Sequence, residues 1–191
     1  NDRVGKKLFI TGKGRCNVTN AKDISEFFDY IYGNPHFLYS SLYSFTNEDT
    51  IHFFENQGIK LKTERGGRIF PSSDKSSDII KGLSNGLKEN NVQVKLNSKV
   101  TNILSKNDRI LGVEINNSQK IIGDHSIIAT GGASYPLTGS KGDGYDFAKK
   151  LGHSIIDLKP SLVPIELNEK WLKELMGLSL KNISLSILKN N

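Results

Sequence analysis

The sequence predicts an α/β fold in which helices alternate with short strands. The main observation is a pair of glycine-rich loops at residues 11–17 and 130–144, each after an apolar run that ends in Thr-Gly. Such loops lie at the carboxyl ends of parallel strands, where α/β sheets bind nucleotides. The second observation is an alternating segment at residues 100–122, which predicts a β-meander. We therefore expect a parallel sheet with helices to about residue 157 and both loops at one end of it. The alternative for either loop is a tight turn that glycine permits.

Three helices are expected between the first loop and residue 56. Asp23 can cap the first helix, and Pro35 can start the second. Thr46 can cap the third, with Asp49 at the capping-box position. The Phe and Tyr side chains of residues 27–54 are expected to form core, and the alternative is the wall of a substrate pocket.

The middle of the chain alternates between strand and helix patterns. Residues 60–70 predict a hairpin across Arg-Gly. Ser76 or Ser77 caps a helix that carries apolar residues at helical spacing. Residues 92–96 predict a further strand, which precedes the meander.

Two apolar runs are expected to be strands of the parallel sheet. Residues 8–11 lead into the first glycine loop, and residues 124–129 lead into the second. The second run is mostly β-branched or small and apolar, which is typical of a strand buried on both faces. A helix over residues 145–151 follows the second loop.

The pattern changes near residue 160 to extended segments at residues 162–167 and 180–188. We therefore divide the chain into an α/β part at residues 1–159 and the start of a β-rich part at residues 160–191.

Composition narrows the function class. The formal net charge is +6, but the lysines are scattered among acidic residues, which favours a solvated basic surface over a nucleic-acid face. The single cysteine, Cys16, excludes an intrachain disulfide and a multi-cysteine metal site, and it fits a cytoplasmic location. The four histidines lie far apart, so no metal site is expected. No apolar run approaches the ~20 residues of a membrane span, and the first residues do not form a signal peptide.

Four segments resemble one family of bacterial flavoproteins. Residues 6–20 resemble its first signature, and residues 68–75, 129–145 and 160–164 resemble three more, with the right spacing throughout. The family is that of the NAD(P)/FAD-dependent oxidoreductases of the aminoacetone-oxidase type, among the two-dinucleotide-binding-domain flavoproteins. The resemblance implies an incomplete Rossmann-like FAD-binding domain with a β-meander, followed by the start of an inserted β-rich domain.

The resemblance also implies that the chain is an internal fragment. In the family, a strand, a GxGxxG turn, a helix and a strand ending in an acidic residue precede the position of Asn1. The glycine turn binds pyrophosphate and the acid binds ribose. We therefore expect the 191-residue chain alone to bind FAD weakly or not at all, and to show no turnover.

The same resemblance supplies the candidate cofactor-binding residues. Arg15 would donate charge-assisted hydrogen bonds to phosphate or flavin oxygens. Cys16 is a packing or flavin-contact residue, with a redox nucleophile as the alternative. Val100 matches a residue whose backbone meets adenine, or is a plain core valine, and Asp143 is a ligand or a helix cap. The full set is Thr11, Gly12, Gly14, Arg15, Cys16, Asn17, Val100, Thr130, Gly131, Gly132 and Asp143.

The resemblance implies an FAD-dependent oxidoreductase that transfers hydride between FAD and a small organic substrate or NAD(P)H. No catalytic base is identified. The expected partner is a small-molecule substrate, with neither nucleic acid nor membrane, and the oligomeric state is left open. The alternative is a non-catalytic module that binds nucleotides or polyanions through its glycine loops and basic charge.

Overall fold

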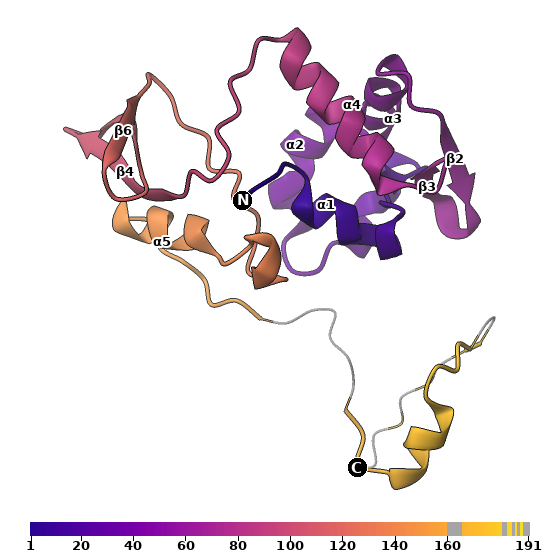
Figure 1. Ribbon diagram of the computed structural model, residues 1–191. Coiled ribbons are helices and arrows are strands. Elements are labelled where there is room, and N and C mark those ends of the chain that lie inside the picture. The colour runs from indigo at the N-terminus through magenta and orange to yellow at the C-terminus, as the bar shows by residue number, and fades with distance from the viewer. Residues whose placement is uncertain (160–165, 181–182, 185, 187, 189–191) are drawn as a thin grey trace. The chain divides into compact units, whose positions relative to one another are not determined.

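The computed structural model describes residues 1–159, 166–180, 183–184, 186 and 188. The chain divides into two compact units, Asn1–Ile155 and Ile156–Asn191. The first unit mixes short helices with two separate three-stranded sheets (Figure 1).

The elements are short. The α-helices are α1 (Lys6–Ile10), α2 (Tyr39–Ser44), α3 (Asn47–Asn56), α4 (Ser76–Glu89) and α5 (Asp143–Lys150). The strands are β1 (Thr19–Asn20), β2 (Leu61–Glu64), β3 (Arg68–Pro71), β4 (Val100–Lys106), β5 (Arg109–Ile115) and β6 (Gln119–Ile122). The 3₁₀ turns are η1 (Thr11–Gly14), η2 (Ile24–Tyr30), η3 (Pro35–Leu38), η4 (Arg65–Gly67), η5 (Pro136–Thr138) and η6 (Lys170–Leu175).

The helix starts predicted at Asp23, Pro35 and Thr46 are confirmed, although the first two open 3₁₀ turns. The Asp23 side chain accepts a hydrogen bond from the Ser25 amide at 2.9 Å and caps η2, and Pro35 opens η3. At α3 the capping box is complete. The Asp49 amide donates to Thr46 Oγ1 at 3.2 Å, and the Thr46 amide donates to Asp49 Oδ2 at 2.8 Å. The cap predicted at Ser76 or Ser77 is wrong, because Lys75 occupies the cap position of α4 and the Ser76 hydroxyl donates to Phe9 O at 3.0 Å instead.

The predicted hairpin is confirmed as β2 and β3. These strands pair antiparallel from Leu61 opposite Pro71 to Glu64 opposite Arg68, across η4. The sequence does not predict β1, which adds to the free side of β3 with Thr19 opposite Ile69. This third strand joins the end of the first glycine loop to the hairpin.

The β-meander is also confirmed, as an antiparallel sheet in the order β4-β5-β6. Its register is irregular between Val100 and Asn102 and between Leu104 and Ser105. Gly112, in the middle of β5, has φ 143°, and a Cβ there would overlap the carbonyl oxygen of Ile121 on β6. The meander therefore depends on glycine at this position.

The parallel sheet is the main correction. Every strand pair in the described residues is antiparallel. Residues 8–11 fall in α1 and η1, and residues 92–96 and 124–129 form no strand. Ile127 has 92% of its surface exposed. A strand persists only where a neighbour accepts and donates its main-chain hydrogen bonds, and these runs have no such neighbour among the described residues.

The core of the first unit lies between the first glycine loop, α3 and α4. Its buried side chains are Cys16, Phe54, Ile59 and Ile79, with Leu8, Val18, Leu61 and Leu83 packed around them. Ile79 of α4 is 1% exposed. Four buried side chains make up this cluster in the described residues, so the core is small.

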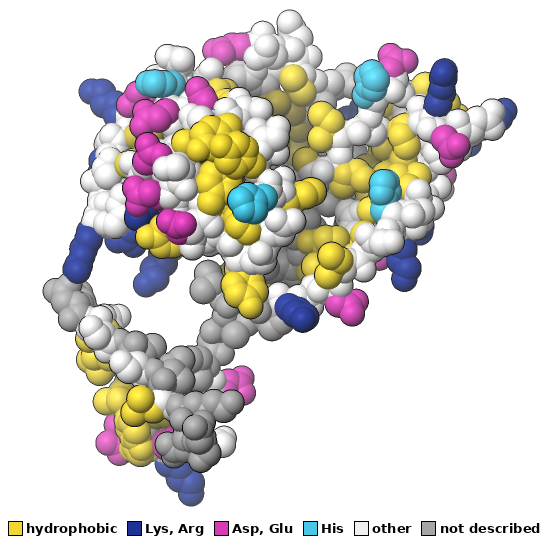
Figure 2. Space-filling model, turned by 180° about the vertical axis from the view of Figure 1, so that it is seen from behind, with side chains coloured by type: hydrophobic (Ala, Val, Ile, Leu, Met, Phe, Trp, Pro, Cys, Tyr) yellow, Lys and Arg dark blue, Asp and Glu magenta, His cyan; other side chains and the backbone are white. Residues whose placement is uncertain are grey.

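The expected aromatic core at residues 27–54 is wrong except for Phe54. Phe28 stacks on Tyr39 and on Tyr43, and the two tyrosine rings are tilted by 39° to each other, with centroid distances of 4.6–5.9 Å in the three pairs. All three rings lie outside the buried cluster. Five rings of this segment are more than half exposed, namely Tyr30, Tyr32, Phe37, Tyr39 and Phe45. Figure 2 shows exposed apolar side chains beside a group of Asp and Glu on the face that it draws. A segment rich in aromatic residues predicts a large apolar surface, but it does not identify the residues or the partner that cover this surface.

The second unit contains η6 among its described residues. Of the extended segments expected at residues 162–167 and 180–188, residues 162–165, 181–182, 185 and 187 lie outside the described part of the chain, and the described remainder forms no strand. Within the described part, no helix is long and apolar enough to cross a membrane.

Candidate functional site

The first glycine loop has an unusual backbone. Gly12, Lys13, Gly14 and Cys16 all have positive φ, from 54° to 85°. A Cβ on Gly12 would lie 3.0 Å from the Asn17 amide nitrogen, so glycine is required there. Lys13 and Cys16 carry side chains in the same region, which costs of order 1–3 kcal/mol each and persists only where neighbours fix the backbone.

Short hydrogen bonds close this loop on itself. The Thr11 hydroxyl donates to Leu8 O at 2.7 Å, and the Cys16 amide donates to Thr11 O at 3.0 Å. The Asn17 side-chain amide, oriented to donate, lies 3.1 Å from Thr19 O and 3.2 Å from Ile69 O. Thr11 and Asn17 thus stabilise the loop and its junction with β3.

Arg15 fastens the loop to the β2–β3 hairpin. Its guanidinium donates to Asp74 Oδ1, 2.8 Å from Nε, and to Glu64 Oε1. The same guanidinium lies over the Phe70 ring, 4.1 Å from its centroid. Lys62 completes the cluster with its Nζ 2.6 Å from Asp74 Oδ2. Hereafter Arg15, Lys62, Glu64 and Asp74 are called the loop clamp.

The loop clamp shifts the ionisation of its members. The hydrogen bonds that Arg15 donates to Glu64 and Asp74 raise the pKa of Arg15. The hydrogen bond from Arg15 lowers the pKa of Glu64, and those from Lys62 and Arg15 lower the pKa of Asp74. Sequence reasoning missed Lys62, Glu64 and Asp74. Lys62 and Glu64 share one face of β2 at i, i+2 spacing, which was an available signal.

Cys16 lies inside the core rather than on the loop surface. It is a free cysteine with 3% of its surface exposed. In this structure its environment matches the packing role, because a thiol that neither solvent nor a partner reaches is poorly placed for nucleophilic attack.

The second glycine loop packs against the start of α5. A Cβ on Gly144 would lie 2.5 Å from Thr130 Oγ1 and 3.0 Å from Ile128 Cγ2, so glycine permits this contact. Gly142, with φ 88°, occupies the cap position of α5. Asp143 is therefore the first helical residue and not the cap.

Gly131 and Gly132 remain accessible in this loop. Gly131 is exposed with φ 73°, and a Cβ there would meet only Ser140 Oγ, at 3.4 Å. Gly132 is half-buried, and Thr130 is exposed. Main-chain N–H groups in such a turn can approach an anion closely, so this loop fits a phosphate-bearing ligand.

The N-terminal segment connects the two loops. Lys7 Nζ of α1 donates to Ser134 O at 3.2 Å, and the Asn1 side chain donates to Thr138 O at 3.1 Å. Since α1 runs directly into the first loop, one short helix contacts both glycine segments (Figure 1). The prediction that the two glycine loops lie at one end of a parallel sheet is wrong, because the described residues form no parallel sheet. Val100 lies at the start of β4, half-buried and opposite Ile115.

Comparison with protein families decides the broader assignment. Residues 1–191 match the family described as the HI0933-like protein Rossmann domain. The chain belongs to the HI0933-like family. Its fold is accordingly a Rossmann-like α/β fold, and the family implies FAD-type dinucleotide binding.

Curated relatives of this HI0933-like chain are enzymes. It is 32% identical over 170 residues to the 3-dehydro-bile acid delta(4,6)-reductase of Clostridium scindens, covering 88% of the chain and 40% of the relative. It is 31% identical over 177 residues to the ribosomal RNA dihydrouridine synthase of Escherichia coli, covering 93% and 43%. The Haemophilus influenzae enzyme of the same name is 31% identical over 182 residues, covering 93% and 45%. The chain thus spans less than half the length of these relatives.

Proposed function

We propose that this HI0933-like chain is part of an FAD-dependent oxidoreductase that transfers hydride between FAD and an organic substrate or NAD(P)H. The observation that carries the proposal is the pair of glycine loops linked through α1 in a Rossmann-family chain. One loop is held rigid by the loop clamp, and the other has accessible backbone at Gly131. A loop that is already rigid loses less conformational entropy when a ligand binds.

The residues divide into two roles in this proposal. The backbone of Gly12, Gly14, Gly131 and Gly132 would hold the dinucleotide, with the Thr130 hydroxyl as a further donor. Arg15 is a positioning residue, because both of its carboxylate partners come from the protein. FAD, when bound, supplies the hydride acceptor or donor, and the protein supplies position and electrostatics.

We further propose reduction of an activated carbon–carbon double bond as the direction of the reaction. One relative is by name a bile-acid reductase, and two others are by name synthases of dihydrouridine, which is uridine with two added hydrogens. Such a reduction adds a hydride and a proton across the double bond. The aminoacetone-oxidase-type specificity and a cytoplasmic location stay predictions.

The test is the flavin content of the protein from the complete reading frame. We expect a yellow protein with a flavin spectrum, and a Gly131→Val variant that retains FAD at least about tenfold more weakly, since the side chain blocks backbone approach. Gly86→Ala is the matched control, because Gly86 is helical and a Cβ there would meet only Gln57 Nε2, at 4.0 Å.

A colourless protein that also fails to bind added FAD would contradict the proposal. A yellow protein that oxidises neither NADPH nor NADH and reduces no conjugated carbonyl compound would instead favour a non-catalytic nucleotide-binding module. Loss of flavin from Gly131→Val together with a lower melting temperature of that variant would show that Gly131 acts through folding.

A further inference from the structure

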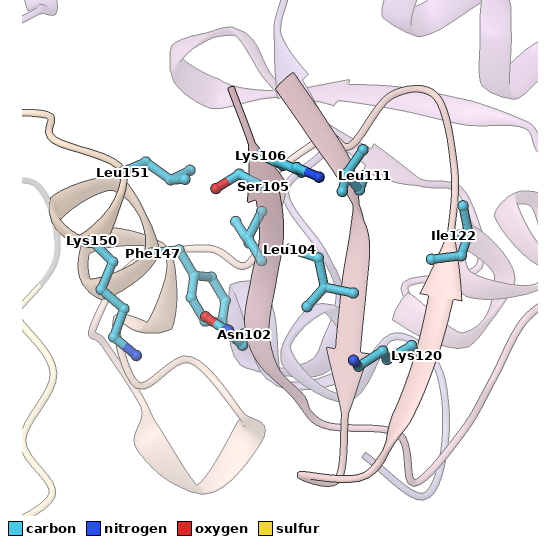
Figure 3. A pocket seen from close by; sticks show the side chains of 11 residues that line it. Asn102, Leu104, Ser105, Lys106, Leu111, Lys120, Ile122, Phe147, Lys150 and Leu151 are labelled. Carbon is cyan, nitrogen blue, oxygen red and sulfur yellow. The ribbon is translucent and has the colours of Figure 1, made fainter. Parts of the chain in front are cut away.

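A second candidate site lies away from both glycine loops, between the β-meander and α5. It is a pocket of about 590 Å³ whose lining includes Leu104, Leu111, Phe147 and Leu151 (Figure 3). Ligand pockets for small molecules typically measure about 300–1,000 Å³. No residue of the two glycine loops lines it.

The side chains of this pocket form an apolar floor with open edges. Phe147 of α5 points toward β4 in Figure 3 and is 7% exposed. At the outer edge Leu111 is 43% exposed and Ile122 is 73% exposed. An apolar ligand seated there would remove both aliphatic side chains from water, at ~25 cal/mol per Å² of buried area.

Three lysines surround this floor from three different elements. Lys106 ends β4, Lys120 lies on β6, and Lys150 ends α5. No carboxylate lines the pocket, and within the described part of the chain none of the three lysines forms an ion pair. The nearest acid by register is Glu114, the cross-strand partner of Lys120. Lys22 and Lys62, by contrast, are each paired with carboxylates.

We propose that this pocket binds an amphipathic carboxylate, with an aliphatic or alicyclic body on the floor and its charge among the lysines. Charge complementarity favours an anion, because three lysines that form no ion pair among the described residues line one cavity and no carboxylate lines it, although Glu114 lies across from Lys120 on β5. The floor selects an aliphatic body. Its one ring, that of Phe147, is buried, so it offers no exposed platform on which a nucleobase could stack.

The experiment is titration of the protein from the complete reading frame with decanoate by calorimetry, below the micelle concentration. Decyltrimethylammonium has the same tail with the opposite charge, and acetate has the charge without the tail. We expect saturable binding of one decanoate per chain, and about tenfold weaker binding or none for both controls, because each lacks one of the two contacts.

Matched variants locate the binding. Replacing Lys106, Lys120 and Lys150 with Gln should weaken decanoate binding at least about tenfold, because the charged contacts are lost. Replacing the exposed Lys88, Lys95 and Lys99 with Gln removes the same net charge elsewhere and should change affinity less than about twofold. Ile122→Asp, at an exposed position, should abolish binding while the far-ultraviolet circular dichroism stays unchanged.

Equal binding of decanoate and decyltrimethylammonium would overturn the proposal, and so would equal losses in the two triple variants. A uridylate oligomer that displaces decanoate and binds more tightly would also overturn it, in favour of a polyanion surface. None of these readouts depends on flavin content, so the outcome is independent of the proposed function.

Discussion

Arg15 shows how a single side chain can fix a strained loop. Its guanidinium contacts Asp74, Glu64 and the Phe70 ring from a loop in which four residues have positive φ. Planar, multidentate donation is a property of arginine that lysine does not share. The bond network therefore gives a direct reason for arginine at this position.

Replacing Arg15 with Lys should loosen the loop without removing the charge. We expect a lower melting temperature and faster reaction of the Cys16 thiol with a disulfide reagent, because the loop holds Cys16 in the core. Thermal denaturation and the rate of thiol modification measure the two effects. Arg109→Lys, on the exposed start of β5, is the control. An unchanged thiol reaction rate in Arg15→Lys would show that other contacts hold the loop.

The two carboxylates of the loop clamp predict a defined pH dependence. Folding lowers the pKa of Glu64 from its ordinary value of 4.5 and that of Asp74 from 3.8. A depressed pKa contributes stability that is present above the unfolded value and is lost as pH falls through the folded value. The Glu64→Gln, Asp74→Asn variant should thus be less stable than the wild type at neutral pH. The difference should shrink in acid below these ordinary values, as urea denaturation would measure. A difference independent of pH would contradict it.

At the residue scale, the sequence indicates some contacts within one helical turn but not contacts between distant segments. Thr46 with Asp49 specifies its own capping box, because both groups lie within one helical turn. The contacts of Arg15 with Glu64 and Asp74, which lie 49 and 59 positions away, were not predicted, and its contact with phosphate or flavin oxygens stays a prediction. No periodicity in one sequence encodes that pairing.

The capping box of α3 is an element-scale feature with a measurable effect. Thr46→Ala removes the acceptor for the Asp49 amide and should destabilise the protein by about 1 kcal/mol. Thr46→Ser should retain most of the stability, because its hydroxyl makes the same bond. Chemical denaturation gives the difference, and Ser41→Ala on the exposed face of α2 is the control. Equal stabilities of Thr46→Ala and the wild type would mean that α3 depends on packing alone.

The meander supplies the second element-scale prediction. Gly112→Ala should separate β5 from β6, because the added methyl group overlaps the Ile121 carbonyl. Faster amide hydrogen exchange in β6 and loss of decanoate binding are the expected results. Gly86→Ala in α4 should instead stabilise the protein by about 0.5–1 kcal/mol, since glycine in a helix interior costs that much. Unchanged exchange in Gly112→Ala would show that the strand shifts to accommodate the methyl group.

Elements that pair with a near neighbour were predictable from the sequence, and the others were not. The hairpin and the meander close over short turns, so alternation and turn residues together specify them. Residues 92–96 and 124–129 have the composition of strands. Composition, however, does not specify the neighbouring strand that must share their main-chain hydrogen bonds. Residues 8–11 carry a short apolar run, which periodicity alone does not distinguish from a helix.

At the scale of the whole molecule, charge is unevenly distributed along the chain. Residues 21–56 contain one lysine and six carboxylates, together with most of the exposed aromatic side chains. The rest of the chain contains 25 Lys and Arg against 14 Asp and Glu. A net charge of +6 therefore conceals an acidic, aromatic surface on a basic protein. Whole-chain composition did not reveal this, because it averages over both parts.

This distribution predicts self-association that weakens with salt. The acidic segment of one copy would contact basic surface on another, and salt at physiological strength screens such contacts beyond about 8 Å. Light scattering should show a larger mean mass at low ionic strength than at high. Replacing Tyr32 and Phe37, both exposed, with Ser should reduce the association at every salt concentration. A mass that rises with salt would indicate apolar contact alone.

The distribution of tryptophan has a consequence for optical experiments. The chain has one tryptophan, Trp171, and it lies in the second unit with 57% of its surface exposed. The first unit, which contains both glycine loops and the lysine pocket, emits only through tyrosine and phenylalanine. Excitation at the red edge of the indole band therefore selects the emission of Trp171. Tyrosine emission and the absorbance of the ligand itself are the signals that follow events in the first unit.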